Sequence, residues 1–178
     1  MVKISHLLAK LEKSKIFKDF KSDKENKDTF FCAAFIIINI KQSTFEYSLD
    51  FRNNKYIFTF KIPSVDGEEI TLAKEELIEG RKPLEKLEEN SASKIKADIE
   101  YIKDIAEKEM KKNKIGQSLE EIIAVLQASE GKLVWNLTCM AAAFTIINMS
   151  INADSSEVIH FEKKNLMDFV SVKKPEKK

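Results

Sequence analysis

The stretch that decides the fold runs from Phe45 to Ile62 and reads FEYSLDFRNNKYIFTFKI. Apolar side chains occupy every second position of its two arms: Phe45, Tyr47, Leu49 and Phe51, then Tyr56, Phe58, Phe60 and Ile62. A period of two is typical of a strand with one buried face. Asn53-Asn54 tolerates the left-handed backbone of a tight turn. We therefore predict two antiparallel strands whose aromatic side chains face helices, in preference to stacking on nucleic-acid bases.

The segments before this hairpin complete a first unit. Apolar residues at helical spacing predict an amphipathic helix from about Ser5 to Lys21, with Ser5 as its cap. The almost wholly apolar stretch from Thr29 to Ile40 predicts a strand buried on both faces. Residues 1–62 are thus expected to form a first α+β module.

Residues 63–92 are expected to connect this module to a second one. A short helix is predicted from Ala73 to Glu79, and Gly80 and Pro83 interrupt it. Polar residues dominate the stretch that follows. This composition indicates a boundary.

The second module is expected to span residues 93–172, followed by a disordered tail at 173–178. Ser93 is the predicted cap of a helix with an apolar stripe, and further strands follow it. Ile122–Gln127 is ambiguous. Ser118 and Glu121 resemble a helical capping box, whereas the apolar run before a turn favours a strand, which we choose.

The predicted fold class is α+β, with helices packed on antiparallel sheet in two related α-β-β-β modules. CAAFIIIN (32–39) resembles AAAFTIIN (141–148), which we attribute to composition. The stronger correspondence places SLDFRNNKYIFTF (48–60) on SINADSSEVIHFE (150–162), turn over turn, 102 residues apart. It favours an internal duplication.

Residues 119–161 resemble a PepSY domain. INADSSEVIHF matches the end of that family's last hairpin, with Asn152-Ala153 and Glu157-Val158 in the corresponding places, although Ser155-Ser156 replaces Thr-Gly. GKLVWNLT matches its central strand, with Trp135 at the usual aromatic position. The resemblance implies a PepSY-like or cystatin-like fold and a tendency to bind peptide-like partners, and it implies no catalytic residue.

The composition argues against strongly charged partners. The 178 residues carry 30 basic and 29 acidic side chains, a net charge of +1 that gives no long-range field toward nucleic acid or a membrane. Charges appear too early for a signal peptide, and no apolar run reaches the length of a membrane span. Cys32 and Cys139 lie in apolar runs and are expected to be buried thiols. We expect a cytoplasmic protein.

The residues needed for catalysis or metal binding are scarce. The four glycines are scattered, which excludes a phosphate-binding loop. A Cys139–His160 nucleophile pair and a metal site at Asp154, His160 and Glu162 are both weaker interpretations than ordinary strand residues. Trp135 is expected to pack in the core. We therefore assign no catalytic, cofactor-binding or metal-binding residue, and we expect no cofactor.

The leading functional hypothesis is a non-enzymatic module that binds a protein or peptide through a sheet edge or a groove between sheet and helices. Association with a second copy of the chain is one form of it. The first alternative is nucleic-acid binding, which requires the helix lysines on one face: Lys3, Lys10, Lys13, Lys15, Lys18 and Lys21. The second is a small-molecule carrier or small enzyme.

Overall fold

The computed structural model describes residues 2–65, 67–78, 84–87 and 95–165. The elements in chain order are α1 (Ile4–Lys13), α2 (Lys15–Ser22), the short 3₁₀ helix η1 (Lys24–Asn26), β1 (Phe30–Asn39), β2 (Thr44–Arg52), β3 (Tyr56–Ile62), β4 (Thr71–Glu76), α4 (Ile99–Lys112), β5 (Leu119–Ser129), β6 (Lys132–Ala141), β7 (Thr145–Asn152) and β8 (Val158–Asn165). The predicted tail at 173–178 lies outside the described residues.

All eight of these strands form one antiparallel sheet in the order β4-β3-β2-β1-β5-β6-β7-β8. β1 and β5 join its two halves, in register from Ala33↔Gln127 to Asn39↔Glu121. The predicted fold class of two α-β-β-β modules is therefore wrong: the protein is mainly one continuous sheet with small helices. The physical reason is that β1 and β5 carry apolar side chains on both faces and pair with each other. Each strand is then interior to the sheet, and neither has an open edge. The preferred strand interpretation of Ile122–Gln127 is confirmed.

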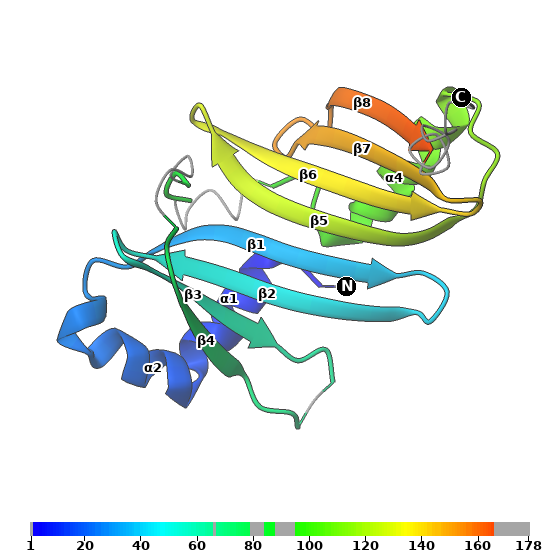
Figure 1. Cartoon of the computed structure of the whole chain (residues 1–178). Coiled ribbons are helices and arrows are strands. Elements are labelled where there is room, and N and C mark those ends of the chain that lie inside the picture. The colour runs from blue at the N-terminus through cyan, green and yellow to red at the C-terminus, as the bar shows by residue number, and fades with distance from the viewer. Residues whose placement is uncertain (1, 66, 79–83, 88–94, 166–178) are drawn as a thin grey trace, which may run out of the picture.

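The core lies on the face of the sheet that the helices cover. α1 and α4 lie behind the sheet in the view of Figure 1, and the other face points toward the viewer. Phe17 and Phe20 of α2 contact the rings of Phe51, Phe58 and Phe60 with centroid distances of 4.9 to 6.5 Å. The hairpin aromatics of the sequence analysis thus face helices, except that Phe45 is partly exposed.

The predicted helix from Ser5 to Lys21 is two helices that meet at Ser14. The Ser14 hydroxyl oxygen accepts a hydrogen bond from the Phe17 amide at 3.3 Å and so caps α2. Ser5 lies inside α1 and does not cap it. The Ile4 amide donates instead to Oδ1 of Asp98, 94 residues away in the sequence, at 3.1 Å. A cap supplied by a distant residue could not be seen in the local pattern.

Two further predictions are corrected along the chain. The segment predicted as a helix from Ala73 forms strand β4, because its backbone pairs with β3 between Thr71 and Glu76. The second helix begins at Ile99, with Asp98 as its cap. The predicted end at Glu79 and the predicted cap Ser93 lie outside the described residues.

The proposed internal correspondence joins strands with different places in the sheet. SLDFRNNKYIFTF lies in β2 and β3, between β1 and the terminal strand β4, whereas SINADSSEVIHFE lies in β7 and β8, and β8 is itself the other terminal strand. CAAFIIIN lies within β1, and AAAFTIIN spans the turn between β6 and β7. Strand position therefore does not support either sequence match.

Candidate functional site

The edge strand β4 has one backbone edge that pairs with no strand in the described part of the chain. It pairs with β3 on one side and ends the sheet on the other, and all six of its residues are exposed. The Leu77 amide donates to the Lys55 carbonyl at 2.9 Å, which fixes the alternation of hydrogen-bonded positions along this ladder. By that alternation the amides and carbonyls of Leu72, Lys74 and Glu76 point away from β3.

Two pockets lie beside β4, near the two ends of α2. The first has a volume of about 500 Å³ and is bounded by the η1 region, the β2–β3 turn, Tyr56 and Lys74. The second, of about 600 Å³, is bounded by the α1–α2 junction and by residues 68–70, which lead into β4. Leu72, Lys74 and Glu76 share the helix-side face with Phe60, Phe58 and Tyr56, their partners in β3. We call β4 and these two pockets the β4 edge site.

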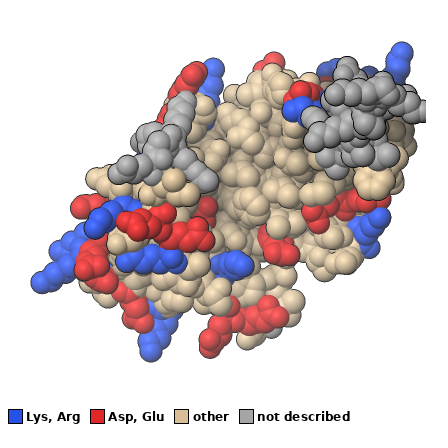
Figure 2. All heavy atoms as spheres, viewed as in Figure 1, with Lys and Arg blue, Asp and Glu red and all other residues tan. Residues whose placement is uncertain are grey.

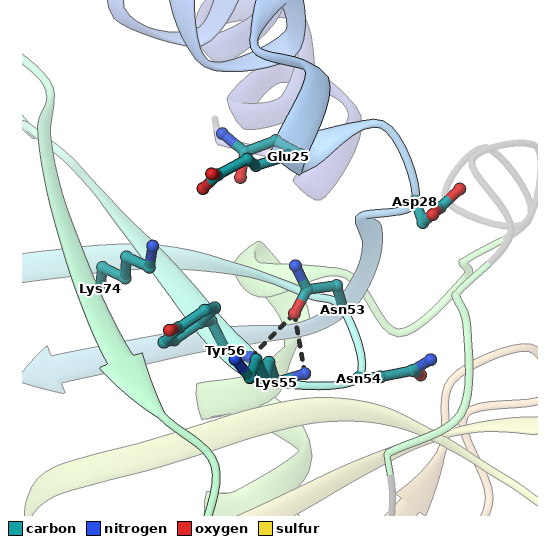
Figure 3. A pocket seen from close by; sticks show the side chains of 8 residues that line it. Glu25, Asp28, Asn53, Asn54, Lys55, Tyr56 and Lys74 are labelled. Atoms are coloured by element: carbon teal, nitrogen blue, oxygen red, sulfur yellow. Dashed lines mark hydrogen bonds between the residues drawn. The ribbon is translucent and has the colours of Figure 1, made fainter.

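The first pocket is built on the β2–β3 turn. Oδ1 of Asn53 accepts hydrogen bonds from the amides of Lys55 at 2.9 Å and Tyr56 at 2.8 Å, which holds the turn. Figure 3 shows that the amide nitrogen of Asn53 then points into the pocket. The Asn53 side chain can therefore donate to a ligand without loosening the turn.

Opposite charges face one another across this pocket. The Lys74 ammonium lies 3.9 Å from the centroid of the Tyr56 ring, a cation–π contact that holds the charge at the pocket wall. Glu25 approaches from the helical side, whereas Asp28 points away (Figure 3). Such a site can contact both an acidic and a basic group of one ligand.

The second pocket also mixes charges. Lys10, Lys13 and Lys15 line it together with Asp19, Glu68 and Glu69. Lys10 is held by a hydrogen bond from its ammonium to the Pro63 carbonyl at 3.0 Å. Lys21 does not line this pocket, and its ammonium donates to the Thr29 carbonyl. Carboxylates therefore accompany the lysines on which the nucleic-acid alternative depends.

The uncovered face of the sheet has little charge over β5–β7, whereas acidic and basic side chains gather near β3, β4 and α2 (Figure 2). Asp50 is a half-buried acid on β2. Burial raises its pKa and Glu75 of β4 raises it further, while a hydrogen bond from Thr59 lowers it. The charges that can select a partner thus lie around β4.

The Cys139–His160 pair does not form. Cys139 is fully buried in the helix-side core on β6, whereas His160 is exposed on β8, and β7 separates the two strands. Trp135 is buried in the core as expected. Within the described ranges, no three His, Cys, Asp or Glu side chains lie together as a metal site would require.

The two thiols are expected to react very slowly in the folded protein. Burial raises the pKa of both Cys32 and Cys139 from 9.0 to about 12, which lowers the reactive thiolate fraction about a thousandfold near neutral pH. Modification with a chromogenic disulfide reagent, with and without denaturant, measures this. Rapid reaction of Cys139 in the native protein would contradict it.

The sequence of β4 does not predict a strand, because Ala, Lys and Glu are poor strand formers. Among the helices of the described chain, none is long and apolar enough to cross a membrane.

Comparison with known proteins shows a fold and no family. No protein-family model matches the sequence, and no curated protein gives a significant match. A crystal structure of a Clostridium difficile 630 protein, provisionally described as a lipoprotein, superposes with a TM-score of 0.53 at 13% sequence identity. The match covers 84% of this chain and 90% of that protein. At that identity the likeness shows a shared fold alone.

Proposed function

We propose that the chain is a non-enzymatic protein-binding or peptide-binding module, and that an extended segment of its partner pairs with β4. The observation that carries this proposal is the free backbone edge at Leu72, Lys74 and Glu76, with a pocket near each end of the strand on its helix-side face. Main-chain hydrogen bonds would supply affinity, and alternate side chains of the partner would enter the pockets.

The charges on β4 restrict which segment can pair. Lys74, Glu75 and Glu76 are exposed, and charged side chains on an edge strand oppose indiscriminate pairing. Unlike charges directly opposite one another stabilise a strand pair, and like charges destabilise it. The preferred partner therefore carries an acidic residue opposite Lys74 and a basic residue opposite Glu76. The PepSY-like resemblance implies the same class of peptide-like partner.

We also propose that the module acts in the cytoplasm. Both cysteines are free and buried, which suits a reducing compartment. Fractionation of source cells with an antibody to the protein tests this location, and recovery in an exported or membrane fraction would contradict it.

A displayed library of extended peptides tests the β4 edge site, with binding of selected sequences measured by calorimetry. Lys74→Pro is expected to weaken binding about tenfold or more, because proline removes an amide that points to the free edge. The same amide is not used by β3, so the fold is expected to persist.

Lys74→Ala is the matched control, because it removes the charge and keeps the amide. It is expected to weaken binding less than Lys74→Pro does, and to reduce the preference for an acidic residue. Equal binding by the proline variant, with its circular dichroism unchanged, would rule out strand addition at β4.

A further inference from the structure

The turn between β6 and β7 combines an exposed aromatic side chain with an unfavourable backbone. Phe144 is 67% exposed. Ala143 and Phe144 both have a φ of 57°, a left-handed conformation that glycine and asparagine adopt far more readily. Exposed Phe144 offsets little of this cost by packing within its own chain. Strain of this kind is often retained where a turn has a role other than stability.

An apolar pocket adjoins the turn. Its volume is about 300 Å³, and its walls include Met140, Ile146 and the alanines at 141–143. Phe144 also lines this pocket although its side chain is mostly exposed, so an exposed aromatic ring and an apolar pocket adjoin each other. We call this surface the Phe144 patch.

The Phe144 patch is electrically compatible with a copy of itself. Glu120 is the one charged residue that lines the pocket among the residues that the structure describes, and the Lys41 ammonium lies 2.8 Å from its carboxylate. In a two-fold interface the same patch meets itself, so a net charge there would repel its copy. The Lys41–Glu120 pair leaves the patch near neutral. A second copy also supplies both the aromatic group and the recess that the patch requires.

We propose that the Phe144 patch is a self-association surface. Two copies of the chain pair about a two-fold axis, and Phe144 of each enters the apolar pocket beside the turn of the other. The patch belongs to β6 and β7, in one half of the strand order, whereas the β4 edge site lies at the far edge of the other half (Figure 1). Dimerisation therefore leaves β4 free, and this proposal does not depend on the proposed function.

Sedimentation velocity of the full chain, from micromolar to near-millimolar concentration, tests the proposal. The unaltered protein is expected to show a reversible monomer–dimer equilibrium. Phe144→Asn is expected to raise the dimer dissociation constant about 30-fold or more, since buried aromatic anchors dominate such interfaces. Its thermal midpoint is expected to stay the same or rise, because asparagine accepts the left-handed backbone. Those two results together separate loss of the interface from loss of the fold.

Two further variants complete the design. Ile159→Asn removes another apolar side chain, 56% exposed on β8, and is expected to leave dimerisation unchanged. Met140→Lys places a charge in the pocket wall and is expected to weaken the dimer about tenfold or more. The proposal is overturned if the unaltered protein is monomeric throughout, if either the Phe144 or the Met140 variant dimerises as tightly as the parent, or if Lys74→Pro alone abolishes the dimer.

Discussion

Trp135→Ala is expected to lower the free energy of unfolding by about 4 kcal/mol, the largest single loss that we predict. Trp135 is fully buried on β6, and its indole Nε1 donates to the Ala97 carbonyl at 2.7 Å. Alanine would leave a large cavity and a buried carbonyl without its donor. The same contact fastens the segment before α4 to the sheet, so the loss extends beyond one strand. Urea unfolding measures this loss. It is followed by circular dichroism because Trp135 is the chain's one tryptophan, so the variant has no tryptophan fluorescence to follow.

Trp135→Phe separates the cavity from the hydrogen bond. It keeps an aromatic ring but removes the donor, and is expected to cost about 2 kcal/mol. Ile159→Ala is the surface control and is expected to change stability by less than about 0.5 kcal/mol. A loss below about 1 kcal/mol for Trp135→Ala would show that the indole is not an anchor of the core.

Asp98→Ala is expected to cost about 3 kcal/mol, because one carboxylate caps two helices. Oδ1 of Asp98 accepts from the Ile99 amide at 2.8 Å and from the Ile4 amide at 3.1 Å. Alanine would leave both amides without this acceptor where Asp98 is now buried. Thermal and urea unfolding measure the loss. A cost near that of an ordinary surface substitution would contradict a shared cap.

Asp98→Asn is the matched control, because its amide oxygen can accept the same two bonds. We expect it to remain within about 1 kcal/mol of the parent near neutral pH. Burial raises the pKa of Asp98, and the hydrogen bonds from Ile99 and Ile4 only partly oppose this. The folded state therefore takes up the proton before the unfolded state does as the pH falls. The parent should gain stability relative to Asp98→Asn as the pH falls through that raised pKa, and level off below the ordinary aspartate value.

The candidate site was only partly predictable. Binding at a sheet edge or between sheet and helices is expected from the sequence, and that function stays a proposal. Strand β4 could not be identified in this way, because Thr71–Glu76 has a composition that favours helix. Pairing with β3 outweighs this preference, because without β4 the backbone of β3 at Phe58 and Phe60 would form the open edge of the sheet. The Phe144 turn was missed for another reason: its sequence, AAF, contains none of the usual residues of a left-handed turn.

The sequence by itself determined the strands β2 and β3 and the burial of Trp135 and of both cysteines, whereas it left Ile122–Gln127 ambiguous between helix and strand until the pairing of β5 decided it. These features follow from local alternation and hydrophobicity, which neighbouring residues carry. Only the tertiary structure decided that β1 and β5 meet, that β4 is a strand, and that Asp98 caps α1 as well as α4. Each of these depends on contacts between residues far apart in the chain. The free energy of such contacts cannot be predicted from a local sequence pattern.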